Sequence, residues 1–351
     1  MNFPHGEDIS RRHLLKIAAG LGVSAALPAG LVSCSPSTPK QDSLVVGGLA
    51  VTCNLTLPVA CAAKEASNVA AGLPTGSFQF EYSKYSGFPE LKESLMSGRI
   101  QAAYILAPMV MDLNDSNIPV KVVSLGHRSG AVIMVRTDSG HKSFKDLVGK
   151  RIAVPSRFSV DMLFLRKMLA EEGMTLKDVE LVEMPPSDMP AALYAKAVDA
   201  YGTGEPFGAA AQIPGYAVPL RMTRDEWPNY ICCVLAVREE LMNTNRAMVQ
   251  DLVNYVQASG VWIDQQRENR KKAVAIAATK KYFNQDPELL QYVMDNPGDR
   301  VTYGDLRMIQ AEFDELMQLS VEAGTLKRPV VFEQYADMSF VKSLTPTSIL
   351  L

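Results

Sequence analysis

From residue 44 onward, short apolar runs alternate with segments whose apolar positions recur every three or four residues. The short runs are typical of buried strands, and the longer segments are typical of amphipathic helices. The runs that predict strands are 44–51, 78–82, 101–107, 120–136, 151–154, 179–183, 200–203 and 231–238. The segments that predict helices between them are 57–66, 88–98, 160–172 and 189–198. This alternation predicts an α/β fold with largely parallel sheets.

After the last strand run the pattern is almost wholly helical, which predicts a helical C-terminal extension. The helices expected there are 246–266, 271–283, 287–296 and 303–323. The long strand run 120–136 is interrupted by the segment GHRSG at 126–130, which predicts a crossing from one sheet to another. A chain of 351 residues, 47% of them hydrophobic, is long enough to divide into two lobes.

The first 43 residues have the pattern of an export leader. The segment SRRHLLK at 10–16 resembles a twin-arginine signal, an apolar run follows to residue 32, and LVSC at 31–34 resembles a lipobox. We therefore predict a signal peptide over 1–33, lipidation of Cys34 and a Pro/Ser-rich tether over 34–43. The alternative is a transmembrane anchor, which would need about 20 apolar residues. The predicted location is periplasmic or cell-surface, anchored to a membrane.

The charge balance argues against nucleic acid as a partner. The chain carries 35 Lys and Arg against 38 Asp and Glu, a net charge of −3, whereas nucleic-acid binding usually needs a concentrated basic surface. The five cysteines and four histidines show no metal-ligand spacing, so the sequence predicts no metal and no cofactor. Cys232 and Cys233 are adjacent, and in a strand their side chains would point to opposite faces.

Four predicted strands end in a small or polar turn that opens a helix. In open α/β sheets, ligands bind beyond the carboxyl ends of the strands, where helix N-termini present free N–H groups. Each turn alone also fits an ordinary βα connection, so the prediction of a shared cleft depends on the four together. The residues that we predict to bind ligand are Thr52, Cys53, Asn54, Pro108, Met109, Ser156, Arg157, Phe158, Glu205 and Phe207.

Several of these side chains have two interpretations. Glu205 either accepts a hydrogen bond from a ligand or caps the helix that begins at Phe207. Arg157 either clamps an anionic group or is solvated, and Cys53 either lines the pocket or packs as a small thiol.

Two further groups of residues also have alternatives. His127 and Arg128 lie at the predicted crossing, where they either contact ligand or make hinge hydrogen bonds. The apolar side chains either form a wall of the pocket or belong to the core. They are Met109, Phe158, Phe207 and Trp227.

Four segments carry a resemblance to the solute-binding proteins of ABC importers. SGRIQAAY at 97–104 resembles their element of a short helix, a glycine and a small-residue strand. FKDLVGKRIAVP at 144–155 and MPAAL at 189–193, continuing to VDAY at 198–201, resemble two further elements. GEPF at 204–207 is similar to a turn of the nitrate, sulfonate, taurine and bicarbonate branch, which also includes pyrimidine-precursor binders.

The resemblance implies a two-lobed type II periplasmic binding fold. Lobe 1 would hold residues 44–130 and 231–351, with the C-terminal helices packed on it, and lobe 2 would hold residues 131–230. The hinge candidates are 126–131 and 224–230. A monomer of this kind captures a small polar organic molecule or an oxyanion by hinge closure and delivers it to a membrane permease.

No bond is broken in that function, so the resemblance implies a binding protein without enzymatic activity. The alternatives are a sensory receptor of the same fold and an enzyme on that fold, such as a pyrimidine-precursor synthase or a menaquinone-pathway enzyme. A carboxylate at the cleft, Glu205, argues against bare nitrate or sulfonate and favours a molecule with polar and apolar parts.

Overall fold

Two five-stranded sheets organise the residues that the computed structural model describes, which are 43–227 and 230–351. The first sheet has the order β2-β1-β3-β11-β4, and the second has the order β10-β6-β9-β7-β8. The strands of the first sheet are β1 (Ser43–Leu49), β2 (Gln79–Tyr85), β3 (Ala102–Leu106), β4 (Val120–Leu125) and β11 (Cys233–Arg238). The strands of the second sheet are β6 (Ala131–Arg136), β7 (Arg151–Val154), β8 (Glu180–Glu183), β9 (Ala200–Gly204) and β10 (Ala217–Met222). The predicted α/β class is confirmed.

The sheets are mixed, so the expectation of largely parallel sheets is wrong. Strand β1 pairs in parallel with β2 and β3, and β7 pairs in parallel with β8 and β9. In contrast, β11 runs antiparallel to β3 and β4, and β6 runs antiparallel to β9 and β10. The reversed strands β6 and β11 each follow a passage of the chain between the sheets. Apolar runs look alike in either direction, so the pattern did not reveal the reversal.

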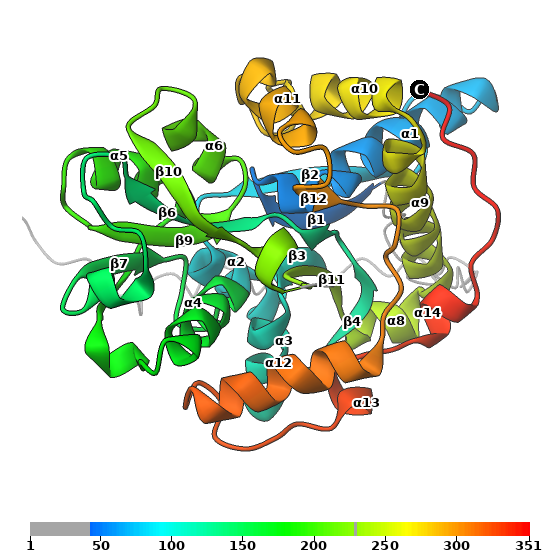
Figure 1. Cartoon of the computed structure of the whole chain (residues 1–351). Helices are drawn as coiled ribbons and strands as arrows, with labels where there is room; N and C mark the ends of the chain where they lie inside the picture. Colours follow the sequence, from blue (N-terminus) through cyan, green and yellow to red (C-terminus); the bar gives the residue numbers. More distant parts are fainter. Residues whose placement is uncertain (1–42, 228–229) are drawn as a thin grey trace, which may run out of the picture. The chain divides into compact units, whose positions relative to one another are not determined.

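Helices connect most of the strands and make up nearly all of the chain after β11. The larger helices are α1 (Thr56–Ala70), α2 (Phe88–Met96), α3 (Ala107–Asp115), α4 (Val160–Glu171), α9 (Arg246–Gln265), α10 (Arg267–Ala278), α11 (Pro287–Asp295) and α12 (Gln310–Glu322). The short ones are α5 (Met189–Tyr194), α6 (Phe207–Gln212), α7 (Thr223–Glu226), α8 (Glu239–Thr244), α13 (Phe332–Tyr335) and α14 (Ser339–Lys342). In Figure 1, the yellow helices α9 and α10 lie beside the blue helix α1, and all three contact one another. Helices α9 and α10 therefore pack on the helix that follows β1 of the first sheet. Helices α11 and α12 also contact α6 and α4, which follow strands of the second sheet.

Helix α4 shows how local sequence sets the boundaries of an element. The Oγ of Ser159 accepts a hydrogen bond from the backbone nitrogen of Met162 and caps the first turn. The apolar side chains of Leu163, Phe164 and Met168 are buried at helical spacing. Gly173 follows the helix with a φ of +75°, a conformation that favours glycine and ends the helix as predicted.

Some local predictions are wrong. The pattern did not predict β10, and the helix expected at 303–323 begins only at Gln310. Just before residue 303, a short ribbon that the pattern did not predict pairs β12 (Val301–Thr302) with β5 (Arg128–Ser129).

The predictions for the leader concern residues that the structure does not describe. The signal peptide at 1–33, Cys34 and nearly all of the tether at 34–43 lie outside the described ranges. Among the described residues, no helix has both the length and the apolar character needed to cross a membrane.

Candidate functional site

The turn after β1 touches the turn after β9, which joins the carboxyl ends of strands from different sheets. The backbone nitrogen of Thr52 donates a hydrogen bond to the carbonyl oxygen of Glu205 at 2.7 Å, and the Thr52 hydroxyl donates to the same oxygen at 3.0 Å. A Cβ added at Gly204 would lie 3.0 Å from the Sγ of Cys53. The two sheets thus approach each other at the turns where the sequence predicts ligand binding.

Glu205 is fully buried, and Arg300 neutralises it. Its Oε1 accepts a hydrogen bond from the Nε of Arg300 at 2.7 Å, and the Nη2 of Arg300 completes the ion pair. Its Oε2 accepts from the backbone nitrogen of Ala209 at 3.0 Å, in the first turn of α6. The carboxylate therefore caps α6 and carries no uncompensated negative charge. Glu205 therefore does not disfavour an anionic ligand, contrary to the expectation from the sequence.

The other turns differ in how exposed their predicted residues are. Ser156 is buried, and its Oγ accepts a hydrogen bond from the backbone nitrogen of Phe158 at 3.2 Å. Arg157 is exposed and donates from its Nε to Glu183 at 2.8 Å, and this contact lowers the pKa of Glu183 against the effect of burial. Pro108 and Met109 are buried at the start of α3. Arg157 thus has a carboxylate partner on its own sheet.

Three unpartnered polar atoms belong to residues at or just after these strand ends. Among the described residues, Asn54 Oδ1, Thr203 Oγ1 and Asp161 Oδ1 are buried without a hydrogen-bond partner, although the Nδ2 of Asn54 donates to the carbonyl of Leu49 at 2.9 Å. Burial raises the pKa of Asp161 well above its usual range, which favours the uncharged acid. A buried polar group without a partner is costly, so these atoms are candidates to bind a ligand.

Three cysteines and a histidine converge behind the turn after β1, contrary to the expectation from spacing. The ligand atoms of Cys53, His127, Cys232 and Cys233 all lie within 4.8 Å of one another, and all four residues are buried. None of the three cysteines is in a disulfide. Hydrogen bonds with Cys232 and Cys233 lower the pKa of Cys53 to about 6, whereas hydrogen bonds with Cys232 and Cys53, together with burial, raise the pKa of Cys233.

The antiparallel direction of β11 explains why the sequence did not predict this cluster. The register pairs Cys233 with Leu106, the last residue of β3, so β11 begins at the edge where β3 ends. A parallel strand would have placed its first residues at the opposite edge. Cys232 also precedes the strand, so the rule of alternating faces does not apply to the pair.

Arg128 and Trp227 have structural partners. Arg128 donates to the carbonyl oxygens of Asp305 and Arg307 at 2.8 Å and pairs with Glu312 at 2.9 Å. The indole Nε1 of Trp227 donates to Glu315 at 3.3 Å. Both residues thus connect the passages between the sheets to α12 or to the segment before it. Arg300 is a functional candidate that sequence reasoning missed, because it lies 95 residues from its partner.

Two cavities include predicted site residues. Phe207 lines one of about 290 Å³, together with Val51 after β1, Tyr85 at the end of β2 and Ser187 before α5. Arg157 and Phe158 line another of about 710 Å³ beside the end of α12. The first cavity takes its walls from elements of both sheets, at the carboxyl ends of β1 and β2.

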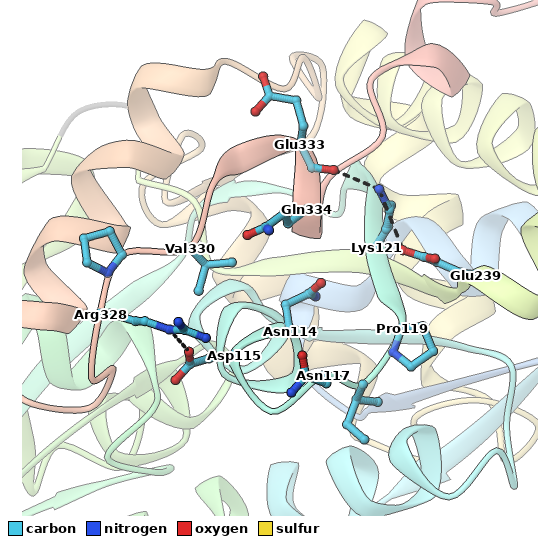
Figure 2. Close-up of a pocket in the computed structure, with 12 residues that line it drawn as sticks. Asn114, Asp115, Asn117, Pro119, Lys121, Glu239, Arg328, Val330, Glu333 and Gln334 are labelled. Atoms are coloured by element: carbon cyan, nitrogen blue, oxygen red, sulfur yellow. Dashed lines mark hydrogen bonds and ion pairs between the residues drawn. The ribbon is translucent and has the colours of Figure 1, made fainter.

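A further cavity of about 560 Å³ lies at the start of β4 and contains none of the predicted residues. Figure 2 shows its polar lining, in which Arg328 pairs with Asp115 and Lys121 lies between Glu239 and the carbonyl of Glu333. Strand β4 begins here and ends near His127, so this cavity and the strand-end turns lie at different ends of that strand.

Comparison with known proteins identifies the family. The NMT1-like family matches residues 37–278 of the 351. The chain belongs to the NMT1-like family. The nitrate/nitrite binding protein NrtA of Nostoc sp. is 24% identical to this NMT1-like protein in an alignment of 257 positions, which covers 67% of this chain and 57% of the Nostoc protein. The chain thus spans a little over half of that relative's length.

Solved structures agree with this assignment. The ligand-binding component of an ABC-type import system from Staphylococcus aureus, with zinc bound, is 26% identical with a TM-score of 0.76, covering 87% of this NMT1-like chain and 99% of that one. The nitrate-binding protein NrtA of Synechocystis PCC 6803 has a TM-score of 0.76 at 17% identity, covering 86% and 87%. The desulfurization enzyme DszB shares the fold more distantly, with a TM-score of 0.57 at 17% identity, covering 86% and 98%. The predicted resemblance to the nitrate and sulfonate branch of binding proteins is confirmed.

Proposed function

We propose that this protein is an extracytoplasmic, lipid-anchored binding protein that captures a small polar organic molecule or an oxyanion and delivers it to an ABC importer. The observation that carries the proposal is the contact between the turns after β1 and β9, beside the unpartnered atoms of Asn54 and Thr203. Relatives named as nitrate-binding proteins and as a component of an ABC import system support it. Ligand capture without bond breakage is the proposed activity.

The two sheets suggest how capture works. We assign residues 44–130 and 231–351 to one lobe and 131–230 to the other, with 126–131 and 224–230 as the hinge. Closure would bring the helix N-termini and small turns of both lobes around the ligand. Since Arg300 neutralises Glu205, the site has no uncompensated carboxylate there and admits oxyanions as well as neutral molecules.

The substitution Thr203→Val tests the proposed site. Valine keeps the shape of threonine and removes only the buried hydroxyl that has no described partner. A panel of nitrate, short alkanesulfonates and pyrimidines is screened by thermal shift, because a ligand that binds the folded state raises the unfolding temperature. The selected compound should bind Thr203→Val about tenfold more weakly in calorimetry, the effect of losing roughly one hydrogen bond.

Glu333→Ala is the matched control for that titration, because Glu333 lines the separate cavity at the start of β4. We expect the control to bind like wild type. If Thr203→Val bound the compound as tightly as wild type and Glu333→Ala bound it more weakly, the ligand would bind in the cavity shown in Figure 2.

Lipid attachment is tested independently by Cys34→Ser. The substitution removes the thiol that would carry the lipid, so we expect the protein to move from the membrane fraction to the soluble extracytoplasmic fraction. Immunoblots of fractionated cells measure this. Continued sedimentation of Cys34→Ser with membranes would refute lipidation at that residue.

A further inference from the structure

We propose that Cys53, His127, Cys232 and Cys233 form a binding site for one thiophilic divalent metal ion, with Zn²⁺ as the ion whose coordination they match. The site goes beyond the proposed function, because it holds a resident ion whichever small molecule the cleft captures.

The donor set is the first observation. Three thiols and one imidazole are a ligand combination that structural zinc sites use, with the metal surrounded tetrahedrally. Zn–S distances of about 2.3 Å and Zn–N distances of about 2.0–2.1 Å place tetrahedral ligand atoms roughly 3.5–3.8 Å apart. The four ligand atoms here lie within 4.8 Å of one another, so side-chain shifts of about an ångström would complete the tetrahedron.

The orientation of His127 is the second observation. Its Nε2 accepts a hydrogen bond from the backbone nitrogen of Cys233 at 3.3 Å, so the lone pair of Nε2 already faces the segment that carries two of the thiols. Its Nδ1 is buried and has no hydrogen-bond partner among the described residues. A metal ion bound to Nε2 would replace the hydrogen bond from Cys233, because this nitrogen has a single lone pair, and Nδ1 would be the nitrogen that carries the N–H.

The position of the cluster indicates a structural role for the ion. Cys53 follows β1, His127 follows β4, and the cysteine pair opens β11, so one ion would cross-link three separate segments of the chain. His127 lies in the passage from the first sheet to β6, and Cys53 lies beside Gly204 of β9. The ion would fix the turn 52–54 against the passages between the sheets.

Burial shields the four ligand side chains from water. All four ligands are at most 2% exposed. Binding one Zn²⁺ converts the three thiols to thiolates and releases up to three protons to solvent, which leaves a net charge of −1 on the complex. The same thiolates would favour soft ions over Mg²⁺ or Ca²⁺, which prefer oxygen ligands.

The test is the metal content of the purified full chain. After reduction, incubation with Zn²⁺ and removal of excess metal, we expect one zinc per chain by elemental analysis. Replacement by Co²⁺ should give the near-ultraviolet charge-transfer absorption of thiolate ligands. Cys232→Ser and Cys53→Ser should weaken Zn²⁺ binding by more than the roughly 10–100-fold that loss of an outer-shell partner costs.

Cys61→Ser is the matched control, because Cys61 is a buried free cysteine of α1 outside the group. This variant should bind one zinc ion, and Zn²⁺ should raise its unfolding temperature as much as it raises that of the wild-type protein.

A reduced wild-type chain that binds no zinc, or Cys53→Ser binding zinc as tightly as wild type, would overturn the proposal. So would a disulfide among the three thiols in the protein isolated without reductant, or binding of Cu⁺ with no binding of Zn²⁺. The wild-type Co²⁺ spectrum decides the question even if a variant fails to fold, and none of these outcomes affects the Thr203→Val titration.

Discussion

Replacing Arg300 by methionine should lower the free energy of unfolding by about 3–5 kcal/mol, because it leaves the buried carboxylate of Glu205 without its cation. Both side chains are at most 2% exposed, and Arg300 also donates to Gln212 at 3.1 Å and to the carbonyl oxygen of Asn296 at 3.0 Å. Its loss therefore removes the ion pair and disconnects the segment before β12 from α6. Urea unfolding followed by circular dichroism measures the effect.

Arg157→Met is the matched control for Arg300→Met. Arg157 also pairs with a glutamate, Glu183, but its side chain is 68% exposed, and exposed pairs contribute about 0–1 kcal/mol. The double variant Glu205→Gln/Arg300→Met should lose less stability than Arg300→Met alone, because it leaves no buried charge. Equal losses for Arg300→Met and Arg157→Met would show that the buried pair does not hold the two turns as described.

Gly260→Ala should also destabilise the protein strongly, by about 1–3 kcal/mol or more. A Cβ at this position of α9 would lie 2.3 Å from the carbonyl oxygen of Tyr303 and 2.8 Å from Cδ1 of Leu306. A backbone oxygen cannot move away as a side chain can, so either α9 or the chain at 303 must shift. In an open helical position the same substitution would stabilise by up to about 1 kcal/mol, so the sign of the effect is diagnostic.

The neighbouring substitution Val261→Ala is the control for Gly260→Ala. Val261 is 59% exposed on the same helix, and alanine there should change stability by only a few tenths of a kcal/mol in the favourable direction. Midpoints of urea unfolding compare the two variants. Stabilisation by Gly260→Ala would mean that α9 does not approach Tyr303 as closely as the structure places it.

The elements that the sequence predicted well are those set by local chemistry. Capping by Ser159 and termination at Gly173 define α4 from its own residues. Apolar periodicity likewise located β1, β3, β9 and β11, since a buried strand needs no distant partner to be recognised. The family resemblance rested on segments of this kind, in their order along the chain.

The site depended on information that local patterns do not contain. The partner of Glu205 is 95 residues away, and the four residues of the thiol cluster come from three segments. The direction of β11 decides whether Cys233 lies beside the end of β3, and apolar runs carry no sign of direction. One signal was present: His127 lies in the predicted crossing 126–131, and Cys232 and Cys233 follow the second predicted crossing, 224–230, within three residues. Crossings between the same two sheets must lie near each other.

A crystal structure of the full chain with the compound that the thermal-shift panel selects tests the central claim most directly. We predict electron density for the ligand beside the contact between the turn after β1 and the turn after β9, next to Asn54 or Thr203. Ligand density confined to the cavity lined by Asn114 and Glu333 would contradict the account, because no residue there belongs to the strand ends that face each other across the two sheets.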